Sequence, residues 1–200
     1  MKRIVLASGN PGKIREIRAL LAPLAIEVVP QSDLGIDEAE EPHDTFLENA
    51  LAKARHASRA AGMPALADDS GLSVDALGGA PGVHSAYYAG RDGDRETRDA
   101  RNNAKLLASL KDDRKAHYTC VLVLVNHPED GKPLVAEGLW HGEIARAPRG
   151  VNGFGYDPIF YIDDLKKTAA ELDPAVKNRV SHRGIALAKL LELLRASSRY

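Results

Sequence analysis

The chain is almost without cysteine, and this excludes several classes of site and scaffold. Cys120 is the only cysteine among 200 residues, so the chain can form neither an internal disulfide nor a metal cage of cysteine ligands. The run Thr119–Val125 around it is apolar, and a free cysteine in such a run behaves as a small hydrophobic side chain. We therefore expect Cys120 to be buried and to serve packing.

Long apolar runs are also missing. Met1–Arg3 is basic, but only five largely apolar residues follow before Gly9, which is too short for a signal peptide. No run elsewhere approaches the roughly 20 apolar residues that cross a bilayer. The sequence predicts a cytoplasmic protein without a membrane partner.

Excess charge of either sign is absent. The 27 Lys and Arg residues nearly balance 28 Asp and Glu residues, which gives a formal net charge of -1 at pH 7. Such a chain has no general attraction to nucleic acid or to an acidic membrane surface. Nucleic acid is therefore not an expected partner, and an anionic ligand would have to be bound by a local cluster of basic side chains.

What is present is the composition of one globular domain. Apolar residues make up 44% and charged residues 28% of the chain, and 200 residues can bury a good core. No repeat, low-complexity tract or linker divides the sequence, so we predict a single domain over residues 1–200. Helical and strand patterns alternate early and strands cluster later, which favours a mixed sheet. The expected strands are 3–7, 25–30, 117–125, 134–137 and 139–145, and the expected helices are 14–21, 46–61, 96–110 and 182–196.

Two adjacent acids, Asp68 and Asp69, stand between two short apolar runs and are followed by Ser70-Gly71. Asp is rare inside strands and common at turns, so the pair is expected at the end of a strand. Carboxylates are suitable ligands for Mg²⁺, and one beside a metal can act as a base. The alternative is an ordinary turn rich in Asp and Ser.

A glycine-rich turn follows the first expected strand. Ser8-Gly9-Asn10-Pro11-Gly12-Lys13 leads into an amphipathic pattern with apolar residues at Ile14, Ile17, Leu20 and Leu21. A strand, a glycine-rich turn and a helix can point backbone N–H groups and a positive helix end at phosphate. The spacing matches neither the P-loop nor the dinucleotide fingerprint. The alternative is a simple turn with a surface lysine.

Candidate groups for a flat ring lie in the C-terminal third. Residues 152–160 place Phe154 and Tyr156 between glycines and end in Asp157-Pro158; aromatic faces stack on bases, and glycine allows a ring to approach the backbone. The alternative is a hydrophobic turn. Lys177 and the pair His182-Arg183 precede or open the last helix, where the dipole disfavours cations. For the pair His182-Arg183 this favours an anionic or acceptor-rich ligand over a solvated basic face; for Lys177 alone, a solvated basic face is a fair alternative.

Together these segments resemble the inosine/xanthosine triphosphate pyrophosphatase family, which removes deaminated purine nucleotides. The resemblance spans nearly the whole chain, with the motifs in the family's order and spacing. It is carried by Ser8-x-Asn10-x-x-Lys13, Glu41, Ala67–Leu72, Gly78–Gly82, Gly153–Pro158, Lys167–Leu172, and Lys177 with Ser181–Arg183. It implies an α/β fold with an elongated mixed sheet, flanking helices and two lobes around a central substrate cleft. It also implies a homodimer, Mg²⁺ dependence, and hydrolysis of ITP, dITP and XTP to the monophosphate and pyrophosphate.

The resemblance also implies site residues. Asp69 would bind Mg²⁺ and activate water for attack on the α-phosphate, and Glu41 would be a second metal ligand; Asp68 competes for either role. Phe154 would stack on the base, while Asp157, His182 and Arg183 would read its edge. The implied substrate-binding set is Ser8, Gly9, Asn10, Pro11, Gly12, Lys13, Lys53, Ser70, Phe154, Gly155, Tyr156, Asp157, Lys177, His182 and Arg183.

Two other functions fit part of the pattern. A Mg²⁺-dependent pyrophosphatase for a modified pyrimidine nucleotide would need the same phosphate end, and only the base-edge residues would differ. A non-catalytic nucleotide-binding module would need the turn and the basic residues, but would have no use for paired acids at a metal position.

Overall fold

The computed structural model describes residues 3–24 and 26–197. Seven strands form one sheet in the order β2-β1-β3-β4-β5-β6-β7. β1 pairs in parallel with β2 and β3, whereas β5/β6 and β6/β7 are antiparallel, so the predicted mixed sheet is confirmed. The strands are β1 Arg3–Ala7, β2 Glu27–Pro30, β3 Ala65–Val74, β4 Lys115–Val125, β5 Leu134–Ile144, β6 Phe160–Ile162 and β7 Lys167–Thr168.

Within the described residues, the α-helices are α1 Pro11–Leu21, α2 Phe46–Ala61, α3 Arg95–Ser109, α4 Pro174–Val180 and α5 His182–Ala196. Local signals fix the ends of α2. The Thr45 hydroxyl accepts a hydrogen bond from the Glu48 N–H at 3.2 Å, and Gly62 adopts the left-handed conformation (φ +64°) that commonly ends helices. The predicted bounds of α2 and α5 are both confirmed.

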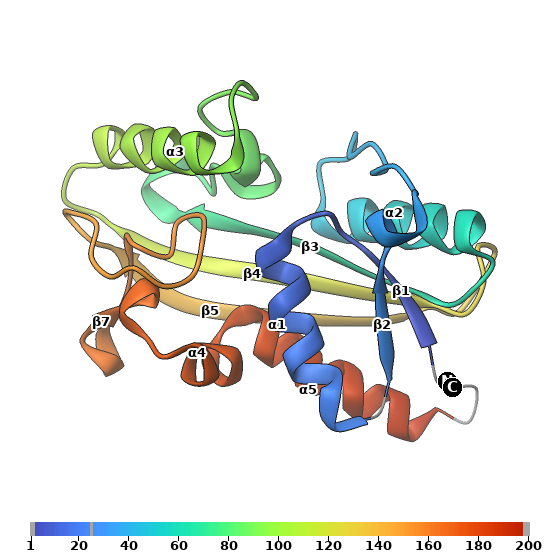
Figure 1. Ribbon diagram of the computed structural model, residues 1–200. Coiled ribbons are helices and arrows are strands. Elements are labelled where there is room, and N and C mark those ends of the chain that lie inside the picture. The colour runs from blue at the N-terminus through green and yellow to red at the C-terminus, as the bar shows by residue number, and fades with distance from the viewer. Residues whose placement is uncertain (1–2, 25, 198–200) are drawn as a thin grey trace. The chain divides into compact units, whose positions relative to one another are not determined.

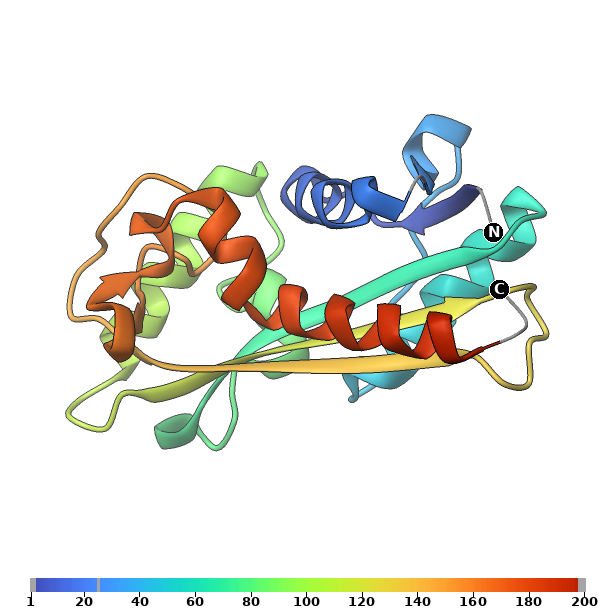
Figure 2. The ribbon, with the colours of Figure 1, turned by 90° about the horizontal axis from the view of Figure 1, so that it is seen from below.

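Contacts divide the chain into two compact units. Unit 1 contains residues 1–69, 120–138 and 182–200, and unit 2 contains residues 70–119 and 139–181. In unit 1, α2 covers one face of the strands and α1 with α5 cover the other (Figures 1 and 2). Residues of β4 alternate between these two cores: Cys120, Leu122 and Leu124 face α1 and α5, and the intervening valines face α2. Cys120 is fully buried, as predicted.

Unit 2 has its own aromatic core. Tyr118, Trp140 and Phe160 pack on one another, with ring centroids 4.7 to 6.4 Å apart. Leu106 and Leu110, from α3 and the residue that follows it, close this core. The apolar face of α3 thereby packs against the aromatic core of unit 2.

Three predictions about elements were wrong. Helix α1 begins at Pro11 instead of Ile14, because the Asn10 side chain caps it. Strand β5 is continuous instead of broken at Gly138: a Cβ at this position would overlap the His182 carbonyl oxygen and lie 2.6 Å from the Ala186 nitrogen. Glycine here permits a close backbone approach within the strand. Strand β3 also runs without a break through Asp68 and Asp69.

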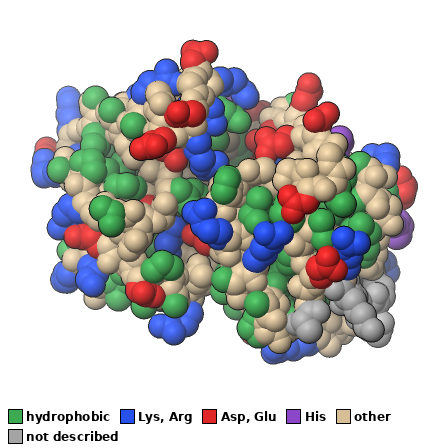
Figure 3. Space-filling model, viewed as in Figure 1, with side chains coloured by type: hydrophobic (Ala, Val, Ile, Leu, Met, Phe, Trp, Pro, Cys, Tyr) green, Lys and Arg blue, Asp and Glu red, His purple; other side chains and the backbone are tan. Residues whose placement is uncertain are grey.

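The surface agrees with the balanced composition. Acidic and basic side chains are interspersed over the face shown in Figure 3. In the part of the chain that the structure describes, no helix has both the length and the apolar character needed to cross a bilayer.

Candidate active site

The two acids lie in the middle of β3, where its neighbour on one side ends. The pairing of β1 with β3 stops at Ala7↔Ala67, and the turn into α1 follows. The Asp68 carbonyl therefore faces side chains: it accepts hydrogen bonds from the Nζ atoms of Lys53 (3.0 Å) and Lys13 (3.4 Å). The strand that ends at this point is β1, whereas β3 continues. Beyond the end of β1 the edge of β3 has no strand partner on that side in the described part of the chain, and two lysines approach it there.

Strand alternation sends the two carboxylates to opposite faces of the sheet. Leu66 belongs to the core under α1 and α5, whereas Ala65 and Ala67 belong to the core under α2. With a period of two, Asp68 faces α1 and α5, and Asp69 faces α2. Adjacent acids thus have different partners.

Asp68 is held between two cations. Its Oδ1 lies 2.6 Å from Lys13 Nζ and its Oδ2 lies 2.6 Å from Arg183 Nε, and Arg183 Nη1 also pairs with Glu16. Burial by itself would raise the pKa of Asp68, but the charges and hydrogen bonds of Arg183 and Lys13 hold that pKa well below its usual value. Asp68 anchors these two side chains, and its lowered pKa favours the ionised form.

Asp69 has a different environment. Its Oδ1 accepts from Lys53 Nζ at 2.8 Å, and the same ammonium contacts Glu41. Its Oδ2 is buried and has no hydrogen-bond partner among the described residues. Burial raises the pKa of Asp69, although the charges of Lys53 and Lys13 oppose this rise. Asp69 is therefore the carboxylate with capacity to bind a further cation or accept a proton.

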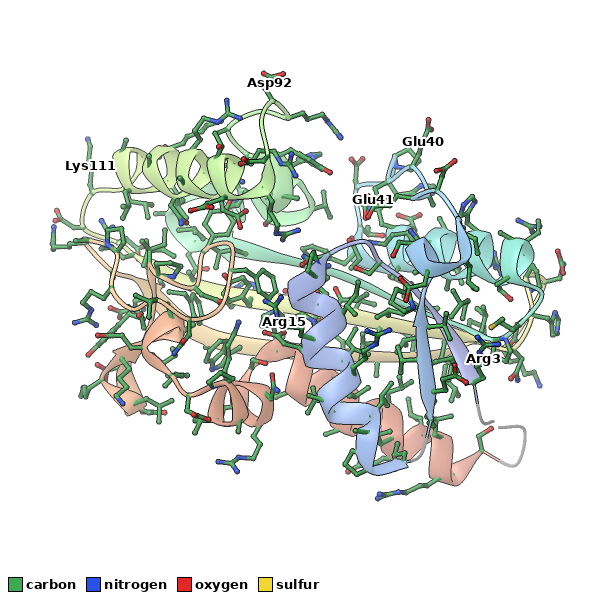
Figure 4. The ribbon with its side chains drawn as sticks, in the orientation of Figure 1. Arg3, Arg15, Glu40, Glu41, Asp92 and Lys111 are labelled. Atoms are coloured by element: carbon green, nitrogen blue, oxygen red, sulfur yellow. The ribbon has the colours of Figure 1, made fainter. Side chains whose placement is uncertain are left out.

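The acidic loop before α2 supplies Glu41. Glu40 points outward, whereas Glu41 reaches back to Lys53 on α2 (Figure 4). Two carboxylates thus converge on one positive charge, next to the unpartnered oxygen of Asp69. This donor set fits Mg²⁺, which protein sites often hold through one or two carboxylates together with waters and substrate phosphates. No group of three or more potential metal-ligating side chains occurs within residues 3–24 and 26–197.

The turn between β1 and α1 is already hydrogen-bonded. Asn10 Oδ1 accepts from the N–H groups of Gly12 (2.9 Å) and Lys13 (3.3 Å), and Ser8 Oγ accepts from the Asn10 N–H at 3.2 Å. The Gly9 N–H donates to Glu38 Oε1 at 3.0 Å. A phosphate that used the Gly9 N–H would have to displace the Glu38 carboxylate.

The predicted aromatic site lies in unit 2. Asp157 Oδ2 accepts from the Phe154 N–H at 2.8 Å and pairs with Lys177 Nζ at 2.5 Å. Lys177 Nζ also lies 4.8 Å from the centre of the Phe154 ring. Lys177 is only 4% exposed, so it is no solvated lysine. Tyr156 is buried, and its hydroxyl donates to the Ser85 carbonyl at 2.9 Å.

His182 and Arg183 open α5 and belong to unit 1. Both are buried, and Arg183 is 1% exposed. The structure gives the Arg183 guanidinium a role in holding Asp68 and Glu16, and its reading of a base edge stays a prediction. Ser70 opens unit 2 in the middle of β3.

Sequence reasoning missed Glu16, Glu38, Asp99 and Asn103. Glu16 follows Lys13 by three residues, a spacing that puts both on one face of a helix, so it could have been found. Asp99 and Asn103 lie on α3 and bond to the backbone of Gly155. Nothing near them in the sequence indicates that contact.

Comparisons with known proteins place the chain in a family over nearly its whole length. The profile of the Ham1 family matches residues 4–193. A protein of Ralstonia nicotianae named dITP/XTP pyrophosphatase is 64% identical over 197 residues, 98% of each chain. One of Burkholderia pseudomallei with the same name is 62% identical over 194 residues, 96% of this chain and 93% of the relative.

Solved structures give the same result. A HAM1 protein from Coxiella burnetii has a TM-score of 0.89 and 49% identity, and the match covers 98% of this chain and 100% of that one. The Ham1 protein of Staphylococcus aureus has a TM-score of 0.83 and 40% identity, covering 98% and 99%.

Proposed function

This chain belongs to the Ham1 family, and we propose that it hydrolyses the non-standard purine nucleotides ITP, dITP and XTP to the monophosphate and pyrophosphate. Relatives at 57–64% identity over nearly the full chain bear the name dITP/XTP pyrophosphatase. The observation in the site that carries the proposal is Asp69. It is a buried carboxylate with a raised pKa and an unpartnered oxygen, beside Lys53 and Glu41. Such a site suits attack of water on a phosphate.

Mg²⁺ is the proposed cofactor, held by Asp69 and Glu41. When bound, it would neutralise phosphate charge and lower the pKa of a bound water. Lys53 Nζ contacts one oxygen of each of these carboxylates and so holds the two groups near each other. Asp69 Oδ2, which has no hydrogen-bond partner among the described residues, is the oxygen left to meet the metal. The fit of the donor set supports the metal independently of the family name.

The protein's own groups would do the rest of the work. Asp69 takes the proton of the attacking water, for which a raised pKa is favourable. Lys13 and Lys53 pair with phosphate oxygens and stabilise the charge that develops on them, as in phosphoryl transfer generally. Asp68 holds Lys13 at 2.6 Å, so that lysine is positioned before substrate arrives.

Base recognition would fall to the aromatic segment of unit 2 and to the start of α5. Phe154 stacks on the purine, and Asp157, Lys177, His182 and Arg183 contact its edge. A 6-oxopurine presents an acceptor where adenine presents an amino donor, and Lys and Arg offer only donors. The remaining predicted contacts are Ser8, Gly9, Asn10, Pro11, Gly12, Ser70, Gly155 and Tyr156.

Three further statements stay proposals. We infer that residues 1–200 act as one pyrophosphatase domain, because the boundary between the units falls inside β3, at Asp69/Ser70. A homodimer and a cytoplasmic location follow from the family resemblance and from the composition. Light scattering on the purified protein tests the dimer, which should have twice the chain mass of 21.5 kDa.

The deciding experiment measures pyrophosphate release from ITP, dITP, XTP, ATP, GTP and a modified pyrimidine triphosphate, with Mg²⁺ and with EDTA. We expect fast release from the first three and loss of release in EDTA. Faster release from the modified pyrimidine triphosphate would show that the substrate is a pyrimidine nucleotide and not a non-standard purine nucleotide. Binding of nucleotides without release of pyrophosphate would show that the protein is a nucleotide-binding module, and it would overturn the proposed enzymatic activity.

A further inference from the structure

We propose that Asp99 and Asn103 on α3 are positioning residues for the ring of Phe154, and through it for the nucleobase. The inference rests on the proposed function, since it assigns Phe154 to base stacking. It adds residues from a helix that has no other role in the site. All groups involved belong to unit 2.

The contacts converge on the residue after Phe154. The Gly155 N–H donates to Asp99 Oδ2 at 2.9 Å, and the Gly155 carbonyl accepts from Asn103 Nδ2 at 3.0 Å. Asp99 and Asn103 are four residues apart and so share one face of α3, which spans the region between the labelled residues Asp92 and Lys111 in Figure 4. Both polar groups of Gly155 are therefore bonded to one rigid element.

This anchoring is needed because the segment is irregular. Gly155 has φ +63°, in the region that favours glycine, and residues 150–156 belong to neither a helix nor a strand. Asp157 fixes the Phe154 N–H from the other side. With the backbone held at three points, the ring is placed before the base arrives, which reduces the entropy lost on binding.

Asp99 also acts on a charge beside the ring. Its Oδ2 lies 3.8 Å from Arg95 Nε, one turn earlier on α3, and Arg95 Cζ lies 5.4 Å from the centre of the Phe154 ring. A cation over an aromatic face is attracted to it. Asp99 thus contacts both the backbone of the loop and a guanidinium that lies next to the Phe154 ring.

The test separates base binding from phosphate binding. We would measure kcat and KM for dITP, and the inhibition constant of inorganic pyrophosphate, in the wild type and in Asn103→Ala, Asp99→Ala and Asp99→Asn. Each alanine variant should raise KM about 3–10-fold, the effect of one lost hydrogen bond. The expected change in kcat and in the pyrophosphate constant is less than about twofold. Asp99→Asn retains an acceptor and should recover most of the affinity.

Asn102→Ala is the matched control. It is the same substitution one residue earlier, and it removes hydrogen bonds to residues 85–89. It should lower the melting temperature while leaving KM near the wild-type value. Unchanged KM in both alanine variants, or a pyrophosphate constant that rises with KM, would overturn the positioning role. Failure of the wild type to hydrolyse dITP would overturn the proposed function itself, so the two failures are distinct.

Discussion

At the scale of single residues, the site depends on the difference between two neighbouring aspartates. Asp68 is fully buried between Lys13 and Arg183, and its low pKa keeps it ionised. Asp69, on the opposite face of β3, retains a free oxygen and a raised pKa. Asp68 therefore holds other side chains in place, whereas Asp69 can still bind a cation or accept a proton.

Substituting each aspartate by asparagine should separate these roles. We expect Asp69→Asn to remain folded and to bind nucleotide, while kcat falls at least about 10²–10⁴-fold through loss of the base. Asp68→Asn removes a charge from a buried network and should cost about 3–5 kcal/mol of unfolding free energy. Urea unfolding and steady-state kinetics measure the two effects. A stable, inactive Asp68→Asn beside an active Asp69→Asn would reverse the assignment.

Arg183 gives a second prediction at this scale. Arg183→Ala leaves Asp68 buried with one cation fewer, so we expect a loss of about 3–5 kcal/mol in the unfolding free energy. The kinetic readout is kcat/KM for ITP and for ATP, measured below the variant's melting temperature. A greater loss for ITP assigns base reading to Arg183, and an equal loss for both nucleotides assigns Arg183 to holding Asp68 and Glu16. Unchanged stability would contradict the ion pairing described above.

At the scale of elements, the close crossing of β5 and α5 decides where α5 begins. The backbone of α5 approaches Gly138 so closely that a Cβ there would overlap the His182 carbonyl oxygen. The atoms that this Cβ would meet, the His182 carbonyl oxygen and the Ala186 nitrogen, belong to the backbone. Rotation of a side chain therefore cannot relieve the overlap. The positions of His182 and Arg183 therefore depend on Gly138 of β5, which allows the start of α5 to lie so close to the strand.

Gly138→Ala should move the start of α5 and so disturb Arg183. We expect a destabilisation of about 1–3 kcal/mol, the usual cost of overpacking, and a lower kcat/KM. Gly131→Ala is the control, since a Cβ at Gly131 meets nothing within 4 Å. Thermal unfolding of both variants measures the difference, and equal melting temperatures would show that α5 accommodates the methyl group without cost.

At the scale of the whole molecule, charge balance separates a nucleotide enzyme from a nucleic-acid protein. The net charge is -1, and both signs are mixed on the face in Figure 3. Three cations of the site are paired with carboxylates: the partly buried Lys13 and Lys53 and the buried Arg183. They can serve one small anion, whereas a polyanion needs an extended basic surface.

We therefore expect duplex DNA to be a poor inhibitor. At low salt, the rate of dITP hydrolysis should change by less than about twofold when DNA is added at a phosphate concentration well above that of the substrate. Inorganic tripolyphosphate is the control anion and should inhibit by competing for Lys13 and Lys53. Strong inhibition by DNA that is relieved by salt would reveal a basic surface that the composition does not indicate.

The sequence by itself determined the features that depend on near neighbours. The bounds of α2 and α5 were predicted from the sequence, and Thr45, Glu48 and Gly62 are local signals at the two ends of α2. The series of motifs predicted the family. Helix caps, turns and hydrophobic periodicity depend on residues only a few positions apart, so they can be recognised in the sequence.

Only the tertiary structure decided which charges are paired and which remain available. Arg183 and Asp68 are separated by 115 positions, yet their pairing makes Asp68 an anchor and leaves Asp69 as the reactive acid. The burial of Lys177 against Asp157, the continuity of β5 at Gly138 and the contacts of Asn103 with Gly155 are of the same kind. Each arises when elements distant in sequence pack together, because burial and charge pairing are properties of the assembled core.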